Sequence, residues 1–432
     1  MSGTYPRTRR ARAGSLLARR QATLGPHSPL FYKKPLHLVC GSGVTLTDVD
    51  GKRYLDGYNN VPHVGHANPE VVQALIASAA RLNISTRYLT EPVVELGEAL
   101  LAQFGQGLDK VFFVNSGSEA NDLALRIARQ HTGATGMLVT DFSYHGTTIA
   151  IAEVTTGLQV ADRLGDHVRA LRVPDLDLDD RPEDEILDEA FGAVDRAIAS
   201  LANSGHGLAG FLFDPLFSTE GLPRVPAGYV EGVCERVRGA GGLIIADEVQ
   251  SGFGRVGSHL WGHQLYGIVP DLVSMGKPMG NGHPVGALVT TSALLDEFGS
   301  SNLYFNTFAG NPVSASVAKA VLEITLRERL ADQAADVGNH LRQGMVELVN
   351  RVPSLGHVKG DGLFVGVTLV DPATGRPDSR AAQGVIEKMR DSGVLISKIG
   401  RHDNVLKVRP PLVFERRHAE ELLDALAGAL QA

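Results

Sequence analysis

Two carboxylates follow a short apolar run in the middle of the chain, and a lysine follows a second such run. Asp247 and Glu248 come directly after residues 243–246, which are all apolar, as in a buried strand of a parallel sheet. Open α/β sheets bind ligands at the carboxyl ends of their strands, so acids at this position are well placed for chemistry. Lys277 follows the run DLVSM in a turn rich in glycine and proline.

A lysine and an aspartate at the ends of two strands suit the chemistry of pyridoxal phosphate. A lysine can carry the aldehyde of this cofactor as a Schiff base, and an aspartate can keep its pyridine nitrogen protonated. We therefore expect Lys277 and Asp247 to be the catalytic pair.

The same segment also matches the dinucleotide fingerprint G-x-G-x-x-G, through Gly252, Gly254 and Gly257. That interpretation requires the glycines to follow the strand directly and to open a helix. Here acidic residues intervene, which would repel a pyrophosphate, and no long amphipathic helix follows before Pro270. The dinucleotide interpretation is therefore disfavoured.

Residues 110–131 predict a strand, a turn of small residues and a helix, in that order. We expect Ser118 to be the helix N-cap, with Gly117 allowing close approach of the backbone. Free amides at a helix N-terminus bind phosphate groups, so this turn is a candidate phosphate site. The alternative is a capped surface helix with nothing bound.

Two further segments carry candidate residues. Tyr144 and His145 follow a third strand-like run, MLVTDF, where an aromatic ring could stack on a flat cofactor or simply pack. Asn306 and Thr307 lie in a polar loop whose hydroxyl and amides could complete a phosphate site.

The segments NSGSEAND, YHG, DEVQSGFGR, MGKPMGNG and FNTFAGNP occur in this order, and together they resemble the class III aminotransferases. These are pyridoxal-phosphate enzymes of fold type I, and the resemblance runs from about Leu30 to the C-terminus. It implies an α/β fold in which a large domain with a mostly parallel, seven-stranded sheet accompanies a smaller α+β domain. It also implies a homodimer with shared active sites.

The resemblance assigns the cofactor contacts residue by residue. Lys277 would hold the aldehyde, Asp247 the pyridine nitrogen and Gln250 the ring hydroxyl. The remaining contacts would come from Tyr144 over the ring, His145 beside it, Gly117 and Ser118 at the phosphate, and Thr307 of the partner subunit.

The phrases NNVPHVGH and NISTRYL resemble a subgroup of this family, the phospho-lyases that act on ethanolamine phosphate and related amino-alkyl phosphates. We expect elimination of phosphate to give acetaldehyde, ammonia and phosphate. The alternative is an ω-aminotransferase that uses a ketoacid. A non-catalytic regulator is disfavoured, because the lysine and aspartate of a working site are both present.

Substrate residues follow from the same resemblance. Arg409 in KVRPPL matches an arginine that commonly binds a substrate carboxylate, and Glu220 matches an acid that pairs with it when no carboxylate is present. The further candidates for holding the substrate phosphate are Arg87, Asn59 and Tyr88.

Composition limits the partners. The formal net charge of -7 gives no basic excess for binding nucleic acid, and no apolar run is long enough to span a membrane. The two cysteines lie far apart in sequence, which favours a reducing cytoplasm over a disulfide framework. His63 and His66 have no acids or cysteines at zinc spacing, so we expect no metal.

The chain exceeds one typical domain, and we divide it into three segments. Residues 1–70 are expected to form a basic arm, a helix and strands that belong to a small domain. Residues 71–320 form the cofactor-binding domain, and residues 321–432 complete the small domain. The arginine-rich start is interpreted as a solvated arm, with a transit peptide as the alternative.

Overall fold

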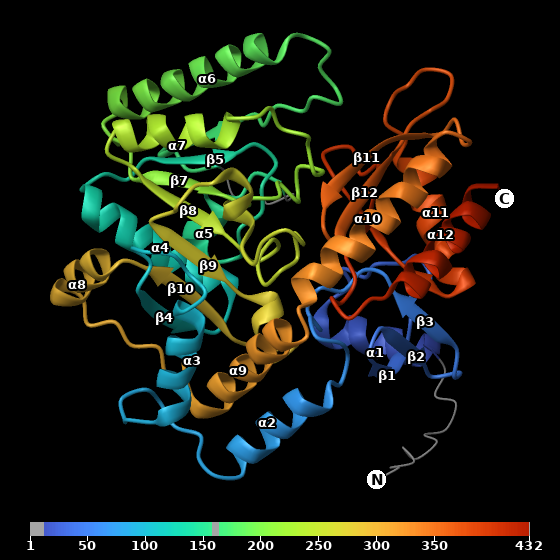
Figure 1. The fold of residues 1–432 in the computed structure, drawn as a ribbon, viewed down its shortest axis with the longest axis horizontal. Coiled ribbons are helices and arrows are strands. Elements are labelled where there is room, and N and C mark those ends of the chain that lie inside the picture. The colour runs from blue at the N-terminus through green and yellow to red at the C-terminus, as the bar shows by residue number, and fades with distance from the viewer. Residues whose placement is uncertain (1–12, 158–163, 432) are drawn as a thin grey trace.

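A seven-stranded sheet forms the centre of the larger half of the molecule (Figure 1). The structure is a computed structural model that describes residues 13–157 and 164–431, so most of the expected basic arm lies outside the described residues. In spatial order the strands are β4 (Lys110–Val114), β10 (Gly286–Thr290), β9 (Leu272–Met275), β8 (Leu243–Asp247), β7 (Gly210–Phe213), β5 (Met137–Thr140) and β6 (Val168–Leu171).

The sheet is mostly parallel, as the sequence predicts. Only β10 runs antiparallel to its two neighbours, β4 and β9. The strands from β9 to β6 are parallel throughout, and Asp247 at the end of β8 lies opposite Ser274 of β9. The apolar strands are buried because helices cover both faces of the sheet.

Helices of the larger half form two layers around this sheet. On one face lie α4 (Gly117–Thr132), α5 (Ile149–Ala152) and α8 (Ser292–Ser301), and on the other lie α6 (Glu183–Asn203) and α7 (Tyr229–Gly239). Figure 1 shows α6 and α7 above the sheet. The remaining elements are α2 (Pro69–Ala79), α3 (Glu91–Leu101), α9 (Pro312–Arg327) and the 3-10 turns η1 (Gly262–Tyr266) and η2 (Lys277–Gly280).

The smaller half contains two four-stranded sheets. One has the order β11 (Leu355–Asp361), β12 (Phe364–Leu369), β15 (Val405–Val408) and β14 (Ser397–Ile399). The other has the order β1 (Leu38–Ser42), β2 (Thr45–Asp48), β3 (Arg53–Asp56) and β13 (Val394–Leu395). The helices of this half are α10 (Leu330–Val349), α11 (Ser379–Ser392), α12 (Arg416–Gln431) and the N-terminal α1 (Ala13–Leu24).

The N-terminal strands share a sheet and a core with the end of the chain. Strand β13 pairs in parallel with β3, and the buried side chains of Val44 and Leu55 join one cluster with Val394 and Leu422. This continuity supports our proposed division, in which residues 1–70 contribute to the small domain. Strands β2 and β3 pair antiparallel around Asp50-Gly51, a dipeptide that is a hairpin turn signal in the sequence.

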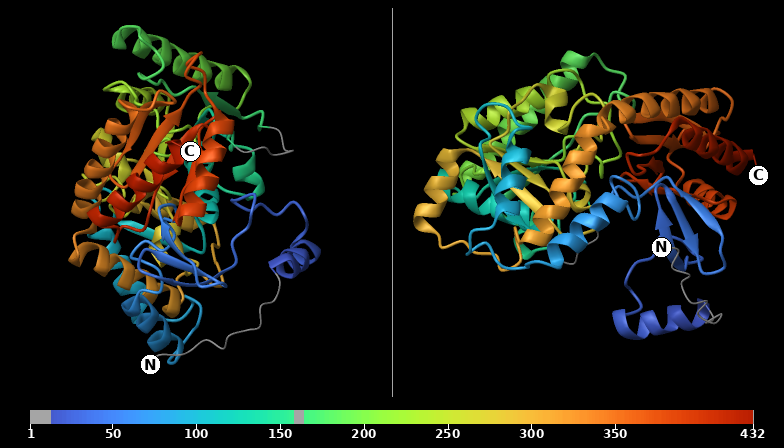
Figure 2. Two further views of the ribbon diagram at one scale, coloured as in Figure 1. Left: turned by 90° about the vertical axis from the view of Figure 1, so that its right-hand side faces the viewer. Right: turned by 60° about the horizontal axis from the view of Figure 1, so that its bottom comes forward.

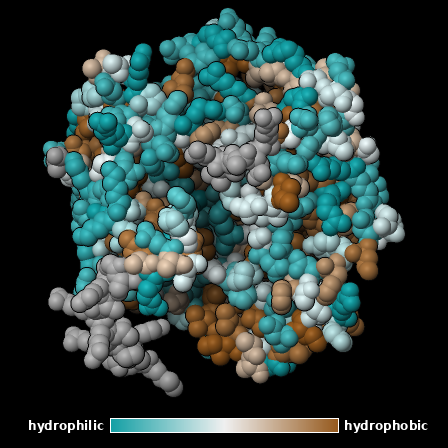
Figure 3. Space-filling model, turned by 180° about the vertical axis from the view of Figure 1, so that it is seen from behind, coloured by the Kyte–Doolittle hydropathy of each residue, from teal (hydrophilic) through white to brown (hydrophobic). Residues whose placement is uncertain are grey.

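The described helices include none that is long and apolar enough to cross a membrane. Both cysteines are free, with Cys40 exposed and Cys234 buried. Figure 2 shows α1 standing away from the rest of the chain. Figure 3 shows hydrophobic side chains along the lower edge of the molecule, at the height of α2 in Figure 1, and a hydrophilic hollow near the centre of that face.

Candidate active site

The carboxyl edge of the seven-stranded sheet brings the predicted residues together. Strands β8 and β9 are parallel neighbours, so Asp247 at the end of β8 and Lys277 two residues beyond β9 leave the sheet at the same edge. Strand β5 ends at this edge too, and the segment after it carries Tyr144 and His145. Because β4 also points this way, the N-terminus of α4 lies beside them.

Asp247 is almost fully buried and held by three donors. Its Oδ2 accepts a hydrogen bond from Asn121 Nδ2 at 2.9 Å and lies 2.8 Å from His145 Nδ1. Its Oδ1 accepts from the amide of Val249 at 3.1 Å. These contacts fix the orientation of a carboxylate that would otherwise be costly to bury.

Lys277 opens the short turn η2 with a positive φ of 20°, which is uncommon outside glycine. Burial, and next the positive charge of Arg409, lower the pKa of its amine to about 8, while Asp247 and Asp214 act in the opposite direction. At neutral pH, a larger fraction of the Lys277 side chain is therefore the free amine than for an ordinary lysine. The free amine is the form that attacks an aldehyde or accepts a proton.

Helix α4 is capped two residues earlier than predicted. Ser116, not Ser118, is the N-cap, because its hydroxyl accepts a hydrogen bond from the amide of Glu119 at 3.2 Å. The S-x-x-E spacing of Ser116 and Glu119 is the capping-box pattern, which was readable in the sequence. The correction leaves Gly117 and Ser118 as the first two residues of the helix.

The start of α4 fits a phosphate group. Within residues 13–157 and 164–431, the amides of Gly117 and Ser118 donate to no acceptor. Any Cβ on Gly117 would lie 2.6 Å from Val249 Cγ2, so the backbone approaches more closely here than a side chain allows. Free amides that donate to a phosphate, the Asp247 carboxylate that accepts from a protonated pyridine nitrogen and the Lys277 amine lie at one edge, and this is the set of groups that pyridoxal phosphate requires.

Tyr144 and His145 flank Asp247. The pKa of Tyr144 is raised by burial and then by the negative charge of Asp247, and its side chain remains partly exposed. His145 is buried, and its Nε2 has no hydrogen-bond partner within the described residues. The partly exposed ring of Tyr144 is available to stack on a flat cofactor, and His145 Nε2 keeps an unused hydrogen-bonding position beside Asp247.

Arg409 is buried and reaches the same site. One of its terminal nitrogens donates to Gln250 Oε1, which also accepts from Asn60 Nδ2 at 3.3 Å. The guanidinium lies 5.3 Å from the ring centres of both Tyr58 and Phe364. Its buried Nε has no partner within the described residues, so Arg409 keeps a donor for a ligand.

The expected pair between Glu220 and Arg409 does not form. Glu220 Oε1 instead accepts a hydrogen bond from Thr140 Oγ1 at 2.5 Å. Burial, and next the charge of Asp214, raise the pKa of Glu220 to about 8, so the carboxyl is mostly neutral at pH 7. A neutral acid offers no counter-charge to the arginine.

The side-chain amide of Asn59, which we expected to hold the substrate phosphate, binds Asp56 instead. Its Nδ2 donates to both oxygens of Asp56, at 3.0 and 3.1 Å, and Asp56 also lies 2.7 Å from His66 Nε2. His63 Nε2 lies 2.8 Å from the carbonyl of Phe253. These polar residues hold the segment after β3 in place.

Three predicted residues lie on the surface of this chain. Arg87, Tyr88 and Thr307 are exposed, and the Arg87 guanidinium lies 4.0 Å over the ring of Phe305. Asn306, next to Thr307, is anchored at the start of α4, where its Nδ2 donates to Glu119 Oε2 at 2.8 Å. A single chain therefore does not bring these three side chains to Lys277.

The pattern of one protein family covers nearly the whole chain. The family described as aminotransferase class-III matches residues 32–430. The chain belongs to this family. Its fold is that of the fold type I pyridoxal-phosphate enzymes.

Individual members of the class III family are similar over almost their full length. A phospholyase from Arthrobacter, solved in complex with phosphoethanolamine, is 57% identical, with 96% of this chain and 99% of that chain covered and a TM-score of 0.95. A Drosophila melanogaster protein named alanine–glyoxylate aminotransferase 2-like is 40% identical, covering 96% of this chain and 86% of its own. A Caenorhabditis elegans protein named ethanolamine-phosphate phospho-lyase homolog 1 is 35% identical, covering 96% and 93%.

The glycines that imitate the dinucleotide fingerprint have a packing role in this class III fold. A Cβ on Gly257 would lie 2.8 Å from Ala335 of α10, and a Cβ on Gly254 would lie 3.0 Å from Ala331. The segment after β8 therefore packs its backbone directly on α10. It opens no long helix, which removes the dinucleotide interpretation.

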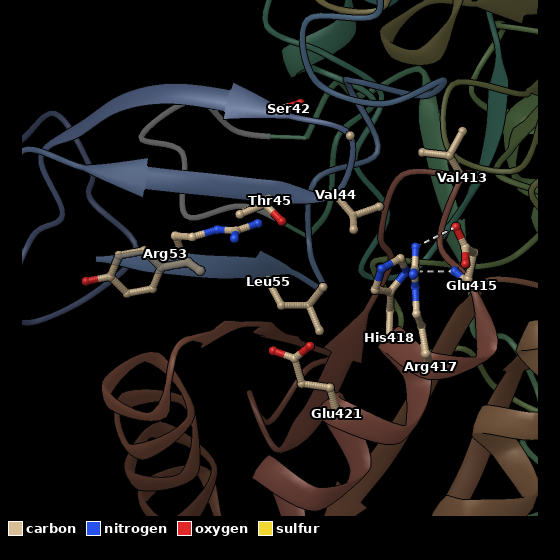
Figure 4. A pocket seen from close by; sticks show the side chains of 12 residues that line it. Ser42, Val44, Thr45, Arg53, Leu55, Val413, Glu415, Arg417, His418 and Glu421 are labelled. Carbon is tan, nitrogen blue, oxygen red and sulfur yellow. Dashed lines mark hydrogen bonds and ion pairs between the residues drawn. The ribbon is translucent and has the colours of Figure 1, made fainter. Parts of the chain in front are cut away.

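A separate cavity of about 780 Å³ lies between the β2–β3 hairpin and the start of α12 (Figure 4). It contains none of the predicted site residues. Its Arg417 is paired with Glu415 at 3.0 Å, and the amide of Glu415 donates to His418 at 2.9 Å. These polar groups pair with one another, so we place the candidate active site at the carboxyl edge of the seven-stranded sheet instead.

Two residues at the site were missed by the sequence reasoning. Asn121 holds Asp247 although it lies on the buried face of α4, where a polar residue among Ala120, Leu123 and Ala124 was the available signal. Lys407 is a buried lysine within the apolar strand β15, and its two-residue spacing from Arg409 places both on one face.

Glu248 is structural rather than catalytic. Its carboxylate is fully buried and accepts hydrogen bonds from Ser251 Oγ at 2.6 Å and from the amides of Gly262 and His263, each at 2.8 Å. We expect Glu248→Ala to lower the free energy of unfolding by about 3–5 kcal/mol, because these donors are left buried without an acceptor. Denaturant unfolding measures this, with Glu248→Gln as the isosteric control; a loss below about 1 kcal/mol would contradict the assignment.

Proposed function

We propose that this protein is a pyridoxal-phosphate-dependent phospho-lyase that eliminates phosphate from ethanolamine phosphate. The observation that carries the proposal is the 57% identity, over 96% of the chain, to a phospholyase in complex with phosphoethanolamine. The geometry agrees, because Arg409 is buried beside Lys277 and Glu220 does not neutralise it. A substrate with an anionic group suits this site.

The residues that would hold the cofactor follow from the contacts above. We assign the phosphate to Gly117 and Ser118, the pyridine nitrogen to Asp247, and the aldehyde to Lys277. Tyr144 and His145 would lie beside the ring, and Gln250, which accepts a hydrogen bond from Arg409, would contact the ring hydroxyl. When bound, pyridoxal phosphate supplies an electron sink for the carbon that carries the substrate nitrogen.

The chain's own groups then decide the outcome. The Lys277 amine takes a proton from the carbon that bears nitrogen. The electron pair forms a carbon–carbon double bond, and the carbon–oxygen bond breaks with its pair on the phosphate oxygen. Water converts the released enamine, so ethanolamine phosphate and water give acetaldehyde, ammonia and phosphate. Donors that hold the phosphate in line with the reacting carbon favour this elimination over transamination.

We propose a homodimer with shared active sites. Side chains around the exposed Arg87 and Thr307 are strongly apolar and uncovered, with Leu89 102% and Leu303 95% exposed. Exposed apolar patches of this kind mark interfaces between proteins. The dimer would bring Arg87 and Tyr88 to the substrate phosphate, and the partner's Thr307 to the cofactor phosphate.

We expect Thr307→Ala to weaken cofactor retention. Its hydroxyl is one donor to a charged phosphate, worth roughly 1.5–3 kcal/mol, so the dissociation constant should rise about 10- to 150-fold. Titration of the cofactor-free dimer with pyridoxal phosphate, followed by absorbance, measures this, and Thr307→Ser is the control that keeps the hydroxyl. Sedimentation that finds a fully active monomer would contradict the shared site.

The second candidate function is an ω-aminotransferase, which the Drosophila relative's name favours. Supplying ethanolamine phosphate and pyruvate together distinguishes the two. A phospho-lyase releases phosphate and acetaldehyde and forms no alanine. An aminotransferase forms alanine and leaves the phosphate ester intact.

We also propose a cytoplasmic location. An exposed free cysteine, Cys40, and a buried free cysteine, Cys234, suit a reducing compartment. Fractionation of cells that express the full chain tests this. Recovery in an oxidising compartment would contradict it.

A further inference from the structure

Lys407 extends the cationic side of the site beyond the predicted residues. It lies in β15, with 8% of its surface exposed, and Arg409 two residues later is 4% exposed. Side chains two apart in an extended segment point to the same face. The Lys407 ammonium lies 5.1 Å from the ring centre of Tyr58, and the Arg409 guanidinium lies 5.3 Å from the same ring. The side-chain cations of Lys407 and Arg409 therefore both contact the ring of Tyr58.

The ammonium of Lys407 has no carboxylate partner within residues 13–157 and 164–431. Burial lowers its pKa well below the usual value, the charges of Arg409 and Lys277 lower it further, and only Asp214 acts in the opposite direction. Lys359, another buried lysine, is paired in the usual way, with Asp175 at 2.7 Å and Asp177 at 2.9 Å. A buried lysine without such partners is costly unless a ligand supplies them.

Most oxygens of the nearby carboxyls already accept hydrogen bonds from other groups. Asp214 accepts from the amide of Leu216 at 2.9 Å and from the hydroxyl of Ser218, and burial raises its pKa to about 6. Glu220 Oε1 accepts from Thr140, its Oε2 has no hydrogen-bond partner within the described residues, and the carboxyl is mostly neutral at pH 7.

Asp247 is bonded to Asn121 and His145. None of these acids forms a salt bridge with Lys407 or Arg409 within the described residues, so both side chains keep donors for an anion. A doubly charged anion supplies acceptors to both.

We propose that Lys407, together with Arg409, binds the phosphate of the substrate and so selects phosphorylated amines. This inference rests on the proposed function, and it names the group that recognises the substrate class. An ammonium binds phosphate as a compact charge, while the guanidinium adds oriented donors. When the carbon–oxygen bond breaks, the phosphate oxygen keeps the electron pair, and the Lys407 ammonium stabilises the charge that develops there.

The test compares Lys407→Met with Lys407→Arg in the cofactor-loaded dimer, where pyridoxal phosphate already fills the start of α4. Lys398→Met is the matched control, because Lys398 lies on the adjacent strand β14 and pairs with Asp403 at 3.0 Å, outside the site. The readouts are the dissociation constant of inorganic phosphate by calorimetry, KM for ethanolamine phosphate, and the absorbance change on adding ethanolamine.

We expect Lys407→Met to raise the dissociation constant of phosphate and KM for ethanolamine phosphate by roughly 30-fold or more. The response to ethanolamine should change by less than about threefold, since it lacks phosphate. Lys407→Arg and Lys398→Met should remain within about threefold of the wild type. Lys407→Gln gives the same comparison if the methionine variant does not fold.

A folded, cofactor-loaded Lys407→Met that binds phosphate as the wild type does would overturn the inference. If that variant lost affinity for ethanolamine and ethanolamine phosphate equally, Lys407 would be structural and the inference would also fail. The proposed function is tested separately. If the wild type binds phosphate through Lys407 but releases no phosphate from ethanolamine phosphate, the phosphate-binding role of Lys407 is retained and the assigned reaction is wrong.

Discussion

Lys277→Ala is expected to abolish phosphate release and to remove the visible absorbance of the bound cofactor. Loss of a general base alone lowers turnover by roughly 10²- to 10⁴-fold, and loss of the covalent attachment adds to this. The reason lies in the position of Lys277, which leaves the carboxyl edge beside Asp247 with a pKa lowered to about 8. Absorbance spectra and a phosphate assay measure both effects.

Methylamine provides the control for this prediction. A small amine can occupy the space of the missing side chain, so partial recovery of turnover would show that the site is otherwise intact. An alanine variant with unchanged absorbance and turnover would show that another lysine carries the cofactor.

Asp247→Asn is expected to lower kcat by roughly 10²- to 10³-fold while the protein keeps its fold. The amide has the same shape, but it removes a negative charge placed where positive charge must be stabilised. Asn121 and His145 still surround the position, so the melting temperature should fall by only a few degrees.

Steady-state kinetics and thermal unfolding measure this second prediction. The control is Glu248→Gln, the same change from acid to amide at the adjacent residue. Glu248 faces Ser251 and the turn at Gly262 rather than the cofactor site, so its amide should affect stability more than kcat. An Asp247→Asn variant with the wild-type kcat would remove Asp247 from the catalytic pair.

Strand ends and local turns were predictable from the sequence because their signals are local. The apolar runs that end at Asp247 and before Lys277 are the buried strands β8 and β9. The hairpin at Asp50-Gly51 was predictable for the same reason. The N-cap of α4 was misplaced by two residues although the spacing of Ser116 and Glu119 carried the signal.

The partners of buried polar groups were not predictable, because they depend on contacts between distant segments. Glu220 meets Thr140 rather than Arg409 only because β5 and the segment after β7 end side by side. The pairing of β13 with β3 joins the two ends of the chain and has no local sequence signal. Arg87 and Thr307 depend on a second copy of the chain, so their roles remain predictions.

The most direct test of the central claim is a ketoacid-free incubation of the purified protein with pyridoxal phosphate and ethanolamine phosphate. We expect phosphate and acetaldehyde to appear in equal amounts and to exceed the enzyme concentration many times, because elimination regenerates the cofactor at every turnover. A wild-type protein that releases no phosphate, yet aminates a ketoacid when one is added, would contradict the phospho-lyase assignment and establish the aminotransferase.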